Sequence, residues 1–416
     1  MRSQWSSILY ALCAIALLVL GSVEVSFAGA APAGKPIRIG DVNSYSGLAT
    51  VFTFPYKEGI TMALNEINAA GGILGRRLEF VFRDDKLKPD EAVKMARELV
   101  FQEKVDLLSG CISSAVGLAL SEFAKESKAL FFASHCQTSA LTWNRGHPYV
   151  AHTTNNTNMY TRALAKVAAT YPYKRWAHIS PDYEYGHDLW DNFWGYLKTL
   201  RPEVELVQEN WPKLGEPDHS AYITALLHSG AEAFFSGVWG AQEIAFAKQA
   251  KPFGLFEKIA YFSPAIGTPD ELDPLGKEAP VGAVTTGFPW YDEGVQKLHP
   301  QLSEWVKKYR DATSGQEPKL GSSWGYATSS IIAEAIKRAG AMDPEKVIRV
   351  LSQGFDIEFP WGVVVMRGCD QQALPPQWTG VVRLNPEGKP IMAEVQEIQG
   401  KDVVRSCGEV ADLRKK

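Results

Sequence analysis

The sequence contains no stretch rich in lysine and arginine, and its charges nearly balance. Among 416 residues, 43 Lys and Arg stand against 47 Asp and Glu, which gives a formal net charge of −4 at pH 7. Proteins that bind nucleic acid concentrate basic residues on one face, so we expect no nucleic-acid partner. With 45% hydrophobic and 22% charged residues, the composition is that of an ordinary folded protein of two or three domains.

The motifs of several enzyme classes are also missing. The chain has no P-loop, no G-x-G-x-x-G and no H-E-x-x-H pattern, so nucleotide hydrolase, dinucleotide oxidoreductase and metalloprotease activities have no sequence support. Residues 321–325 match G-x-S-x-G, but that motif needs a buried strand before its serine, and 313–319 is polar. We expect Ser322 or Ser323 to cap a helix instead. The sequence therefore indicates no enzyme and requires no cofactor.

Cysteine is scarce, and its spacing does not suit a metal site. Of five cysteines, Cys13 lies in the apolar N-terminal stretch, and the others are Cys111, Cys136, Cys369 and Cys407. No C-x-x-C pair occurs, so we expect no metal ion. In an oxidising compartment the four later cysteines permit three sets of disulfides. Among these possibilities we favour a Cys369–Cys407 bond.

The N-terminus has the pattern of a cleaved export signal. Arg2 supplies a positive charge, residues 8–20 are almost wholly apolar, and Ser26-Phe27-Ala28 carries small residues at the two positions that signal peptidase reads. The alternative is an uncleaved membrane anchor. The apolar run has 13 residues, however, and a helix needs roughly 20 to cross a membrane. We therefore expect residues 1–28 to be removed and the protein to be periplasmic.

From residue 36 onward, short β-branched apolar runs alternate with amphipathic stretches, which is typical of βα units in a parallel sheet. One series is predicted with strands at 37–42, 78–82, 105–108 and 130–133. A second series follows with strands at 176–179, 204–207, 233–235 and 259–262. The fold class is thus α/β, with two doubly wound, Rossmann-like lobes.

No flexible linker separates the two series, so the chain is expected to cross between lobes at several short segments. We assign 36–154 and 283–360 to the first lobe, and 155–282 and 361–416 to the second. This connectivity predicts a cleft between the lobes.

Polar loops follow two predicted strands of the first lobe, and aromatic residues follow strands of the second. The loops are 109–114, which holds Ser113 and Ser114, and 134–139. In open α/β sheets, ligands bind beyond the carboxyl ends of the strands. Serine hydroxyls and free N–H groups at a helix N-terminus favour an anion, although this segment taken alone favours plain helix capping by Ser113 or Ser114. Tyr185 and Trp239 would offer flat apolar surface to an organic ligand.

Several segments together resemble the type I periplasmic binding proteins that include leucine/isoleucine/valine-binding protein. The most specific is the run Asn-Glu-Ile-Asn-Ala-Ala-Gly-Gly-Ile-Leu-Gly at 65–75, accompanied by 37–40, 45–47, Asp84-Asp85 and 182–186. The resemblance implies two lobes joined by three crossovers, which close on a small ligand and deliver it to the permease of an ABC importer. It also implies a monomer that meets the membrane only through that permease.

The resemblance places Ser114 where amino-acid binders hold the ligand carboxylate, with His135 and Gln137 on the same wall. It places Tyr185 and Trp239 at aromatic contacts of the second lobe. It also places Ala265 where those binders have a glutamate that holds the ligand ammonium, and Gln137 where they have a threonine. A desolvated ammonium without a counter-charge costs several kcal/mol, so an ordinary amino acid is disfavoured.

The ligand expected from these features is a small organic acid, with an aromatic carboxylate as the favoured kind. Amides, urea-like compounds and amino acids remain alternatives. Phe52, Tyr160, Trp290 and Trp324 could extend the aromatic wall or pack elsewhere. A ligand-sensing module for a separate signalling partner is a further alternative, but a receptor with its own anchor would need a long apolar run after Met159, which is missing.

Overall fold

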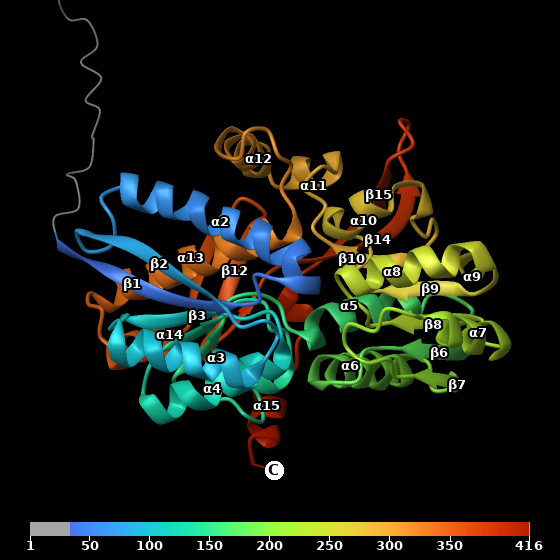
Figure 1. Cartoon of the computed structure of the whole chain (residues 1–416), viewed down its shortest axis with the longest axis horizontal. Coiled ribbons are helices and arrows are strands. Elements are labelled where there is room, and N and C mark those ends of the chain that lie inside the picture. Colours follow the sequence, from blue (N-terminus) through green and yellow to red (C-terminus); the bar gives the residue numbers. More distant parts are fainter. Residues whose placement is uncertain (1–33, 416) are drawn as a thin grey trace, which may run out of the picture.

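Two α/β lobes lie side by side in the computed structural model, which describes residues 34–415 (Figure 1). The expected signal peptide, residues 1–28, lies outside the described residues. None of the helices in the described part of the chain combines the length and apolar character needed to cross a membrane.

The first lobe is built on an eight-stranded sheet of order β11-β12-β13-β5-β4-β3-β1-β2. Its strands are β1 (Gly34–Asn43), β2 (Arg76–Asp84), β3 (Leu107–Gly110), β4 (Phe131–Ala133), β5 (Val150–His152), β11 (Phe355–Phe359), β12 (Gly362–Arg367) and β13 (Gln372–Leu374). The six neighbouring strands β2, β1, β3, β4, β5 and β13 pair in parallel. Strand β12 pairs antiparallel with β13, and β11 pairs antiparallel with β12 at the edge of the sheet.

Helices cover both faces of this sheet, because neighbouring strand residues point to opposite sides. Phe132 packs in the core shared with α2 and α13, whereas Phe131 and Ala133 pack in the core shared with α3 and α4. The helices of the lobe are α2 (Thr50–Ala69), α3 (Pro89–Arg97), α4 (Ser114–Ser127), α11 (Glu293–Leu298), α12 (Gln301–Ala312), α13 (Leu320–Ala339) and α14 (Pro344–Gln353).

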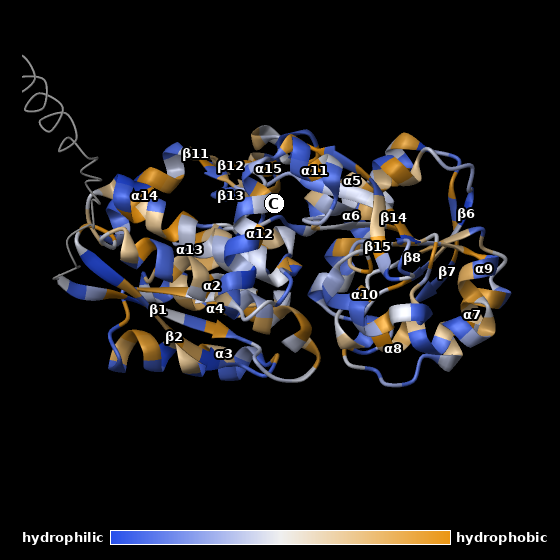
Figure 2. Ribbon diagram, turned by 90° about the horizontal axis from the view of Figure 1, so that it is seen from above, coloured by the Kyte–Doolittle hydropathy of each residue, from blue (hydrophilic) through white to orange (hydrophobic). Residues whose placement is uncertain are grey.

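The second lobe repeats this design around a seven-stranded sheet of order β15-β14-β10-β9-β8-β6-β7. Its strands are β6 (Arg175–Ile179), β7 (Glu205–Asn210), β8 (Ala233–Ser236), β9 (Ala260–Ser263), β10 (Val284–Gly287), β14 (Gln377–Leu384) and β15 (Pro390–Ile398). Its helices are α5 (Thr157–Ala168), α6 (Glu184–Leu200), α7 (Ser220–His228), α8 (Ala241–Ala250), α9 (Leu255–Lys258) and α10 (Pro269–Leu275). Figure 2 shows the two lobes from above.

The chain passes between the sheets three times, and two of the passages differ from the expected boundaries. Strand β10 pairs with β9 and β14 in the second sheet, although 283–360 was assigned to the first lobe. Strands β12 and β13 lie in the first sheet, although 361–416 was assigned to the second. The passages therefore follow β5, β10 and β13. Sheet membership depends on pairing partners far along the chain, which local patterning does not reveal.

Helices α2 and α13 approach each other closely through glycine. A Cβ atom at Gly325 would lie 2.0 Å from the carbonyl oxygen of Tyr56, and one at Gly59 would lie 2.0 Å from that of Ser322. The glycines of the G-x-S-x-G match at 321–325 therefore allow α13 to pack closely against α2, and the match is not a nucleophile motif. Ser322 Oγ accepts the N–H of Lys319 at 3.1 Å, at the start of α13. This close packing fixes the positions of the N-terminal ends of α2 and α13 relative to each other.

Two disulfides are formed, one of which is the favoured pair. Cys369 and Cys407 are bonded with their Cα atoms 6.0 Å apart, and Cys111 and Cys136 with theirs 5.3 Å apart. The first bond ties α15 (Cys407–Leu413) to the first lobe. Arg414 donates hydrogen bonds to carbonyl oxygens of that lobe, at Trp143 and Thr142.

Candidate functional site

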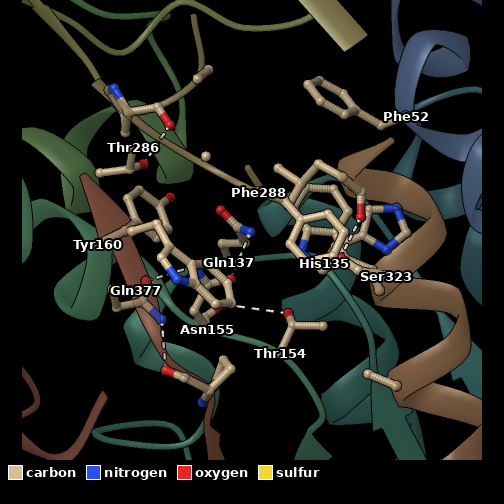
Figure 3. A pocket seen from close by; sticks show the side chains of 18 of the residues that line it. Phe52, His135, Gln137, Thr154, Asn155, Tyr160, Thr286, Phe288, Ser323 and Gln377 are labelled. Atoms are coloured by element: carbon tan, nitrogen blue, oxygen red, sulfur yellow. Dashed lines mark hydrogen bonds between the residues drawn. The ribbon is translucent and has the colours of Figure 1, made fainter. Parts of the chain in front are cut away.

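A cavity of about 110 Å³ lies where the three passages meet the two lobes. The passages themselves contribute six of the lining residues, namely Thr153, Thr154, Asn155, Phe288, Pro375 and Pro376, and Gln377 follows as the first residue of β14. Further lining comes from the polar loop after β4, from α13 and from the second-lobe loops that follow β6, β8 and β9. The cavity is therefore shared by both lobes, and Figure 3 shows part of this lining.

Aromatic rings form much of the wall. In the first lobe Phe52 and Trp324 have ring centroids 5.7 Å apart, and Trp324 stacks on His135 at 5.0 Å with an interplanar angle of 17°. In the second lobe the Trp239 Nε1–H donates to Tyr183 Oη at 3.1 Å. Aromatic walls from both sides make a slot suited to a flat ligand.

His135 is a neutral member of this wall. Burial, together with the neighbouring His152, lowers the pKa of His135 to about 3. Its Nδ1 lies 2.6 Å from Ser134 Oγ, and its Nε2 lies 3.4 Å from Asn43 Nδ2. At neutral pH the ring therefore presents an uncharged aromatic face and offers no cation to a ligand.

No Asp, Glu, Lys or Arg is among the residues that line the cavity in the described part of the chain. Ala265, the position at which the resemblance implied a missing glutamate, is one of the lining residues. A ligand ammonium would therefore be desolvated without a counter-charge. Polar contacts must come from neutral groups. Within residues 34–415, no cluster of His, Cys, Asp or Glu is arranged to hold a metal ion.

Three side-chain amides are linked along the passage side of the cavity. Gln377 Nε2 donates to the carbonyl oxygens of Pro375 and Pro376 at 2.9 and 3.1 Å. Asn155 Nδ2 donates to Gln377 Oε1 at 2.9 Å, and Gln137 Nε2 donates to Asn155 Oδ1 at 3.5 Å. Each amide thus restrains the next, and the series ends at Gln137 beside the cavity.

A buried phenol also faces this space. Tyr160 lines the cavity, is 4% exposed, and its hydroxyl has no hydrogen-bond partner among the described residues. Burial, with the neighbouring Tyr185, raises the pKa of Tyr160 well above its ordinary value. The hydroxyl therefore remains protonated at neutral pH and can donate to a bound molecule.

The structure brings together five of the seven expected site residues. His135, Gln137, Tyr185, Trp239 and Ala265 line the cavity. Ser113 and Ser114 do not; Ser114 is fully buried, and its Oγ accepts the Thr138 N–H at 3.2 Å. The expected contact of these two serines with a ligand stays a prediction; in this structure the hydroxyl of Ser114 holds the neighbouring loop.

Of the four additional aromatic candidates, Phe52, Tyr160 and Trp324 line the cavity. Trp290 instead packs in the first-lobe core, with the Arg310 guanidinium 5.5 Å from its ring centroid.

Several lining residues in the passages, or directly after one in β14, were not anticipated. Asn155, Phe288, Gln377 and Trp378 line the cavity although none was an expected site residue. Their position depends on where the chain crosses between sheets. One available signal was the Pro375-Pro376 pair, since consecutive prolines interrupt a sheet and favour an extended connection.

Residues 36–389 match the family described as periplasmic binding protein. The chain is 28% identical over 328 residues to an "Amino acid binding protein" of Pseudomonas aeruginosa, which covers 74% of this chain and 80% of that protein. It is 26% identical over 357 residues to a "Leu/Ile/Val-binding protein homolog 7" of Brucella suis, which covers 82% of this chain and 86% of that protein.

Among solved structures, the chain is similar to a solute-binding protein of an ABC transporter from Rhodopseudomonas palustris in complex with p-hydroxybenzoic acid. The TM-score is 0.79 and the identity 21%, covering 91% of this chain and 100% of that one. At this identity the likeness establishes the two-lobed fold. The family is one of solute-binding proteins rather than enzymes, and the matched segment includes both lobes. This chain therefore belongs to the periplasmic binding protein family.

Proposed function

We propose that the chain is the exported solute-binding component of an ABC importer and that it closes on a small aromatic acid. The observation that carries this proposal is an aromatic cavity, shared by two lobes, with no charged side chain in its described lining. In this mechanism, contacts formed in the closed state favour closure, and the membrane permease recognises the closed shape.

The size and walls of the cavity support a ring-shaped ligand. Cavities of about 150 Å³ with apolar walls hold benzene, and this one, at about 110 Å³, is of the same order. The stacked pair of Trp324 and His135 on one side and Trp239 on the other offers ring faces to such a ligand. The Rhodopseudomonas palustris relative holds an aromatic acid of this kind.

A carboxylate could be held here by neutral donors. Hydrogen bonds to an anion stabilise it without an ion pair. The unpartnered Tyr160 hydroxyl is one such donor. Its pKa is raised well above the ordinary value by burial, so it donates throughout the neutral range.

Aliphatic amino acids are the second candidate class. The curated relatives named as amino-acid binders favour it. The lining described above offers no carboxylate to an ammonium group, which argues against it. Amides and urea-like solutes carry no net charge and fit the neutral lining. A separate signalling partner could also read the closed state.

A thermal-shift experiment on the purified mature protein tests the ligand class. The protein is unfolded and refolded to remove any carried-over solute, and is then screened with benzoate, 4-hydroxybenzoate, leucine, benzamide and urea. Binding to the native state raises the melting temperature by mass action. We expect shifts with the aryl carboxylates and none with leucine. A shift with leucine alone would contradict the aromatic-acid proposal and favour an amino acid.

The export part of the proposal has its own test. Cleavage after Ala28 would leave Gly29 as the first residue of the mature protein. Intact-mass measurement of protein recovered from the periplasm checks this. A mass that includes residues 1–28 would contradict cleavage.

A further inference from the structure

The three linked amides have a direction that can be assigned from one end. The O and N atoms of a side-chain amide are normally distinguished by their partners. Here the partners of Gln377 are the carbonyl oxygens of Pro375 and Pro376, at 2.9 and 3.1 Å from its Nε2. A backbone carbonyl can only accept a hydrogen bond. The NH₂ group of Gln377 must therefore face the two prolines, and its oxygen must face away from them.

This assignment passes from one amide to the next. The Gln377 oxygen accepts from Asn155 Nδ2 at 2.9 Å, so the Asn155 oxygen is directed toward Gln137. That oxygen accepts from Gln137 Nε2 at 3.5 Å. Reversing any one of the three amides would place two NH₂ groups or two carbonyl oxygens against each other, and unsatisfied polar groups are costly when buried. The series thus leaves one carbonyl oxygen, Gln137 Oε1, at its end.

Gln137 Oε1 is available to a bound molecule. Gln137 lines the cavity, and no described residue donates to its Oε1. Figure 3 shows Gln137 among the side chains that line the pocket, above Asn155 in this view. The site therefore presents a hydrogen-bond acceptor at this point. This acceptor comes from the position at which the resembling amino-acid binders have a small threonine.

We infer that Gln137 selects ligands that carry a hydrogen-bond donor, namely a hydroxyl or N–H group, on the side facing its Oε1. This inference deepens the proposed function and rests on it for the aromatic body of the ligand. A group that only accepts, such as an ether oxygen or a carboxylate, would meet Oε1 with lone pair against lone pair. A site built to pair with a ligand hydroxyl discriminates strongly against the analogue that lacks it, because the site's polar group is then unpaired.

Calorimetric titration of the refolded mature protein with matched probes tests this inference. One series is 4-hydroxybenzoate, 4-aminobenzoate and 4-methoxybenzoate, with the 3-substituted set in parallel. An uncharged pair is benzamide and N,N-dimethylbenzamide. We expect a donor-bearing probe to bind at least tenfold more tightly than the matched probe whose donor is blocked by methyl. Equal affinity, or tighter binding of the methylated probes, would overturn the inference.

The probes also separate this inference from the proposed function. If the benzamide pair shows the donor preference and no aryl carboxylate binds, the acid class is wrong and the role of Gln137 stands. If aryl carboxylates bind without a donor preference, the proposed function stands and the inference is overturned. If no probe of either kind binds, both are overturned.

Two variants identify the residues responsible. Gln137→Met keeps a similar length and removes the acceptor, so the preference for the hydroxyl probe over the methoxy probe should fall to within about threefold, since a selective hydrogen bond is lost. Gln377→Met removes the anchor at the prolines and should reduce the same ratio while Gln137 is retained, which marks Gln377 as a positioning residue.

Gln296→Met is the matched control. Gln296 Nε2 donates to the Trp290 carbonyl oxygen at 2.8 Å, away from the cavity. The affinities for the hydroxyl probe and for the methoxy probe should therefore both stay unchanged. A preserved ratio in Gln137→Met would overturn the inference. If that variant fails to fold, the probe pairs on the unmodified protein still decide.

Discussion

The Tyr160 hydroxyl is buried beside the cavity without a partner among the described residues. In a ligand-free protein such a group is a cost, because a buried hydroxyl has lost its bonds to water. A ligand that accepts from it would remove that cost. His135 contributes a ring face and no charge, since burial lowers its pKa to about 3 and keeps the imidazole neutral. The polar contribution to ligand binding therefore comes from hydroxyl and amide groups.

Tyr160→Phe should separate binding from stability. Removing the unpartnered hydroxyl should leave the melting temperature of the ligand-free protein unchanged or slightly higher. The affinity for 4-hydroxybenzoate should fall about tenfold or more, since a hydrogen bond to a charged group contributes roughly 1.5–3 kcal/mol. Tyr291→Phe is the control: Tyr291 Oη accepts the Met392 N–H at 2.7 Å outside the cavity lining. That variant should lose stability and keep affinity. Unchanged affinity in Tyr160→Phe would exclude this hydroxyl from ligand recognition.

At the scale of whole elements, α10 of the second lobe meets the first turn of α13 in the first lobe. Asp270 accepts the N–H of Leu320 at 2.8 Å, so a carboxylate lies at a helix N-terminus across the lobe boundary. The helix dipole favours the charged form by about 0.3–2 kcal/mol. Burial nevertheless raises the pKa of Asp270 to about 6, despite the backbone hydrogen bond and Lys319. Desolvation therefore outweighs the dipole here.

Asp270→Asn should consequently change stability in a pH-dependent way. A native pKa of about 6, against an ordinary 3.8, means that the folded state loses stability as the pH rises from about 4 to about 6, because the unfolded chain ionises first; the full cost is present above pH 6 and absent well below pH 4. The variant should be more stable than the native chain at pH 8, by up to about 3 kcal/mol, and nearly equal to it at about pH 3. Urea denaturation at four pH values measures this. Lower stability of the variant at pH 8 would show that the helix dipole dominates.

Glycine packing between α2 and α13 gives a second prediction at this scale. In Gly325→Ala the added Cβ would lie 2.0 Å from the Tyr56 carbonyl oxygen, so the helices must separate. We expect a loss of about 1–3 kcal/mol, as for other overpacked sites. Gly195→Ala in α6 is the control, because nothing lies within 4 Å of its added Cβ, and it should gain about 0.5–1 kcal/mol. Equal effects in the two variants would mean that the helices adjust freely.

Local patterning predicts the elements of the first series well but not their membership of a sheet. The expected strand at 130–133 matches β4 (Phe131–Ala133), and the expected strand at 78–82 lies within β2 (Arg76–Asp84). Strand β13 was not anticipated, since its pairing with β5 joins Gln372 to His152, which is far away along the chain. Gln137 was found because a loop after a strand signals a site. Gln377 was not found, because its position beside the cavity depends on where the chain crosses from the first sheet to the second after β13.

At the scale of the whole molecule, side chains of both lobes meet across the cavity. Phe52 and Ile112 of the first lobe pack in one cluster with Trp239 of the second. A Cβ atom at Gly240 would lie 2.8 Å from the Leu48 carbonyl oxygen, which shows how closely the lobes approach. With Asp270 at the start of α13, these contacts describe a closed arrangement. Each of them would be lost on opening about the three passages.

Ligand binding should therefore shift the population toward this closed arrangement. A ligand that contacts both lobes can stabilise only the closed state, so it moves the equilibrium by its difference in affinity for the two states. Small-angle scattering of the refolded mature protein should show a smaller radius of gyration with saturating 4-hydroxybenzoate. Tryptophan fluorescence should change in parallel, because Trp239 and Trp324 line the cavity from opposite lobes. If calorimetry shows saturation and the radius of gyration stays the same, the ligand binds to lobes that are already closed, and recognition by the permease must depend on a smaller change than lobe closure.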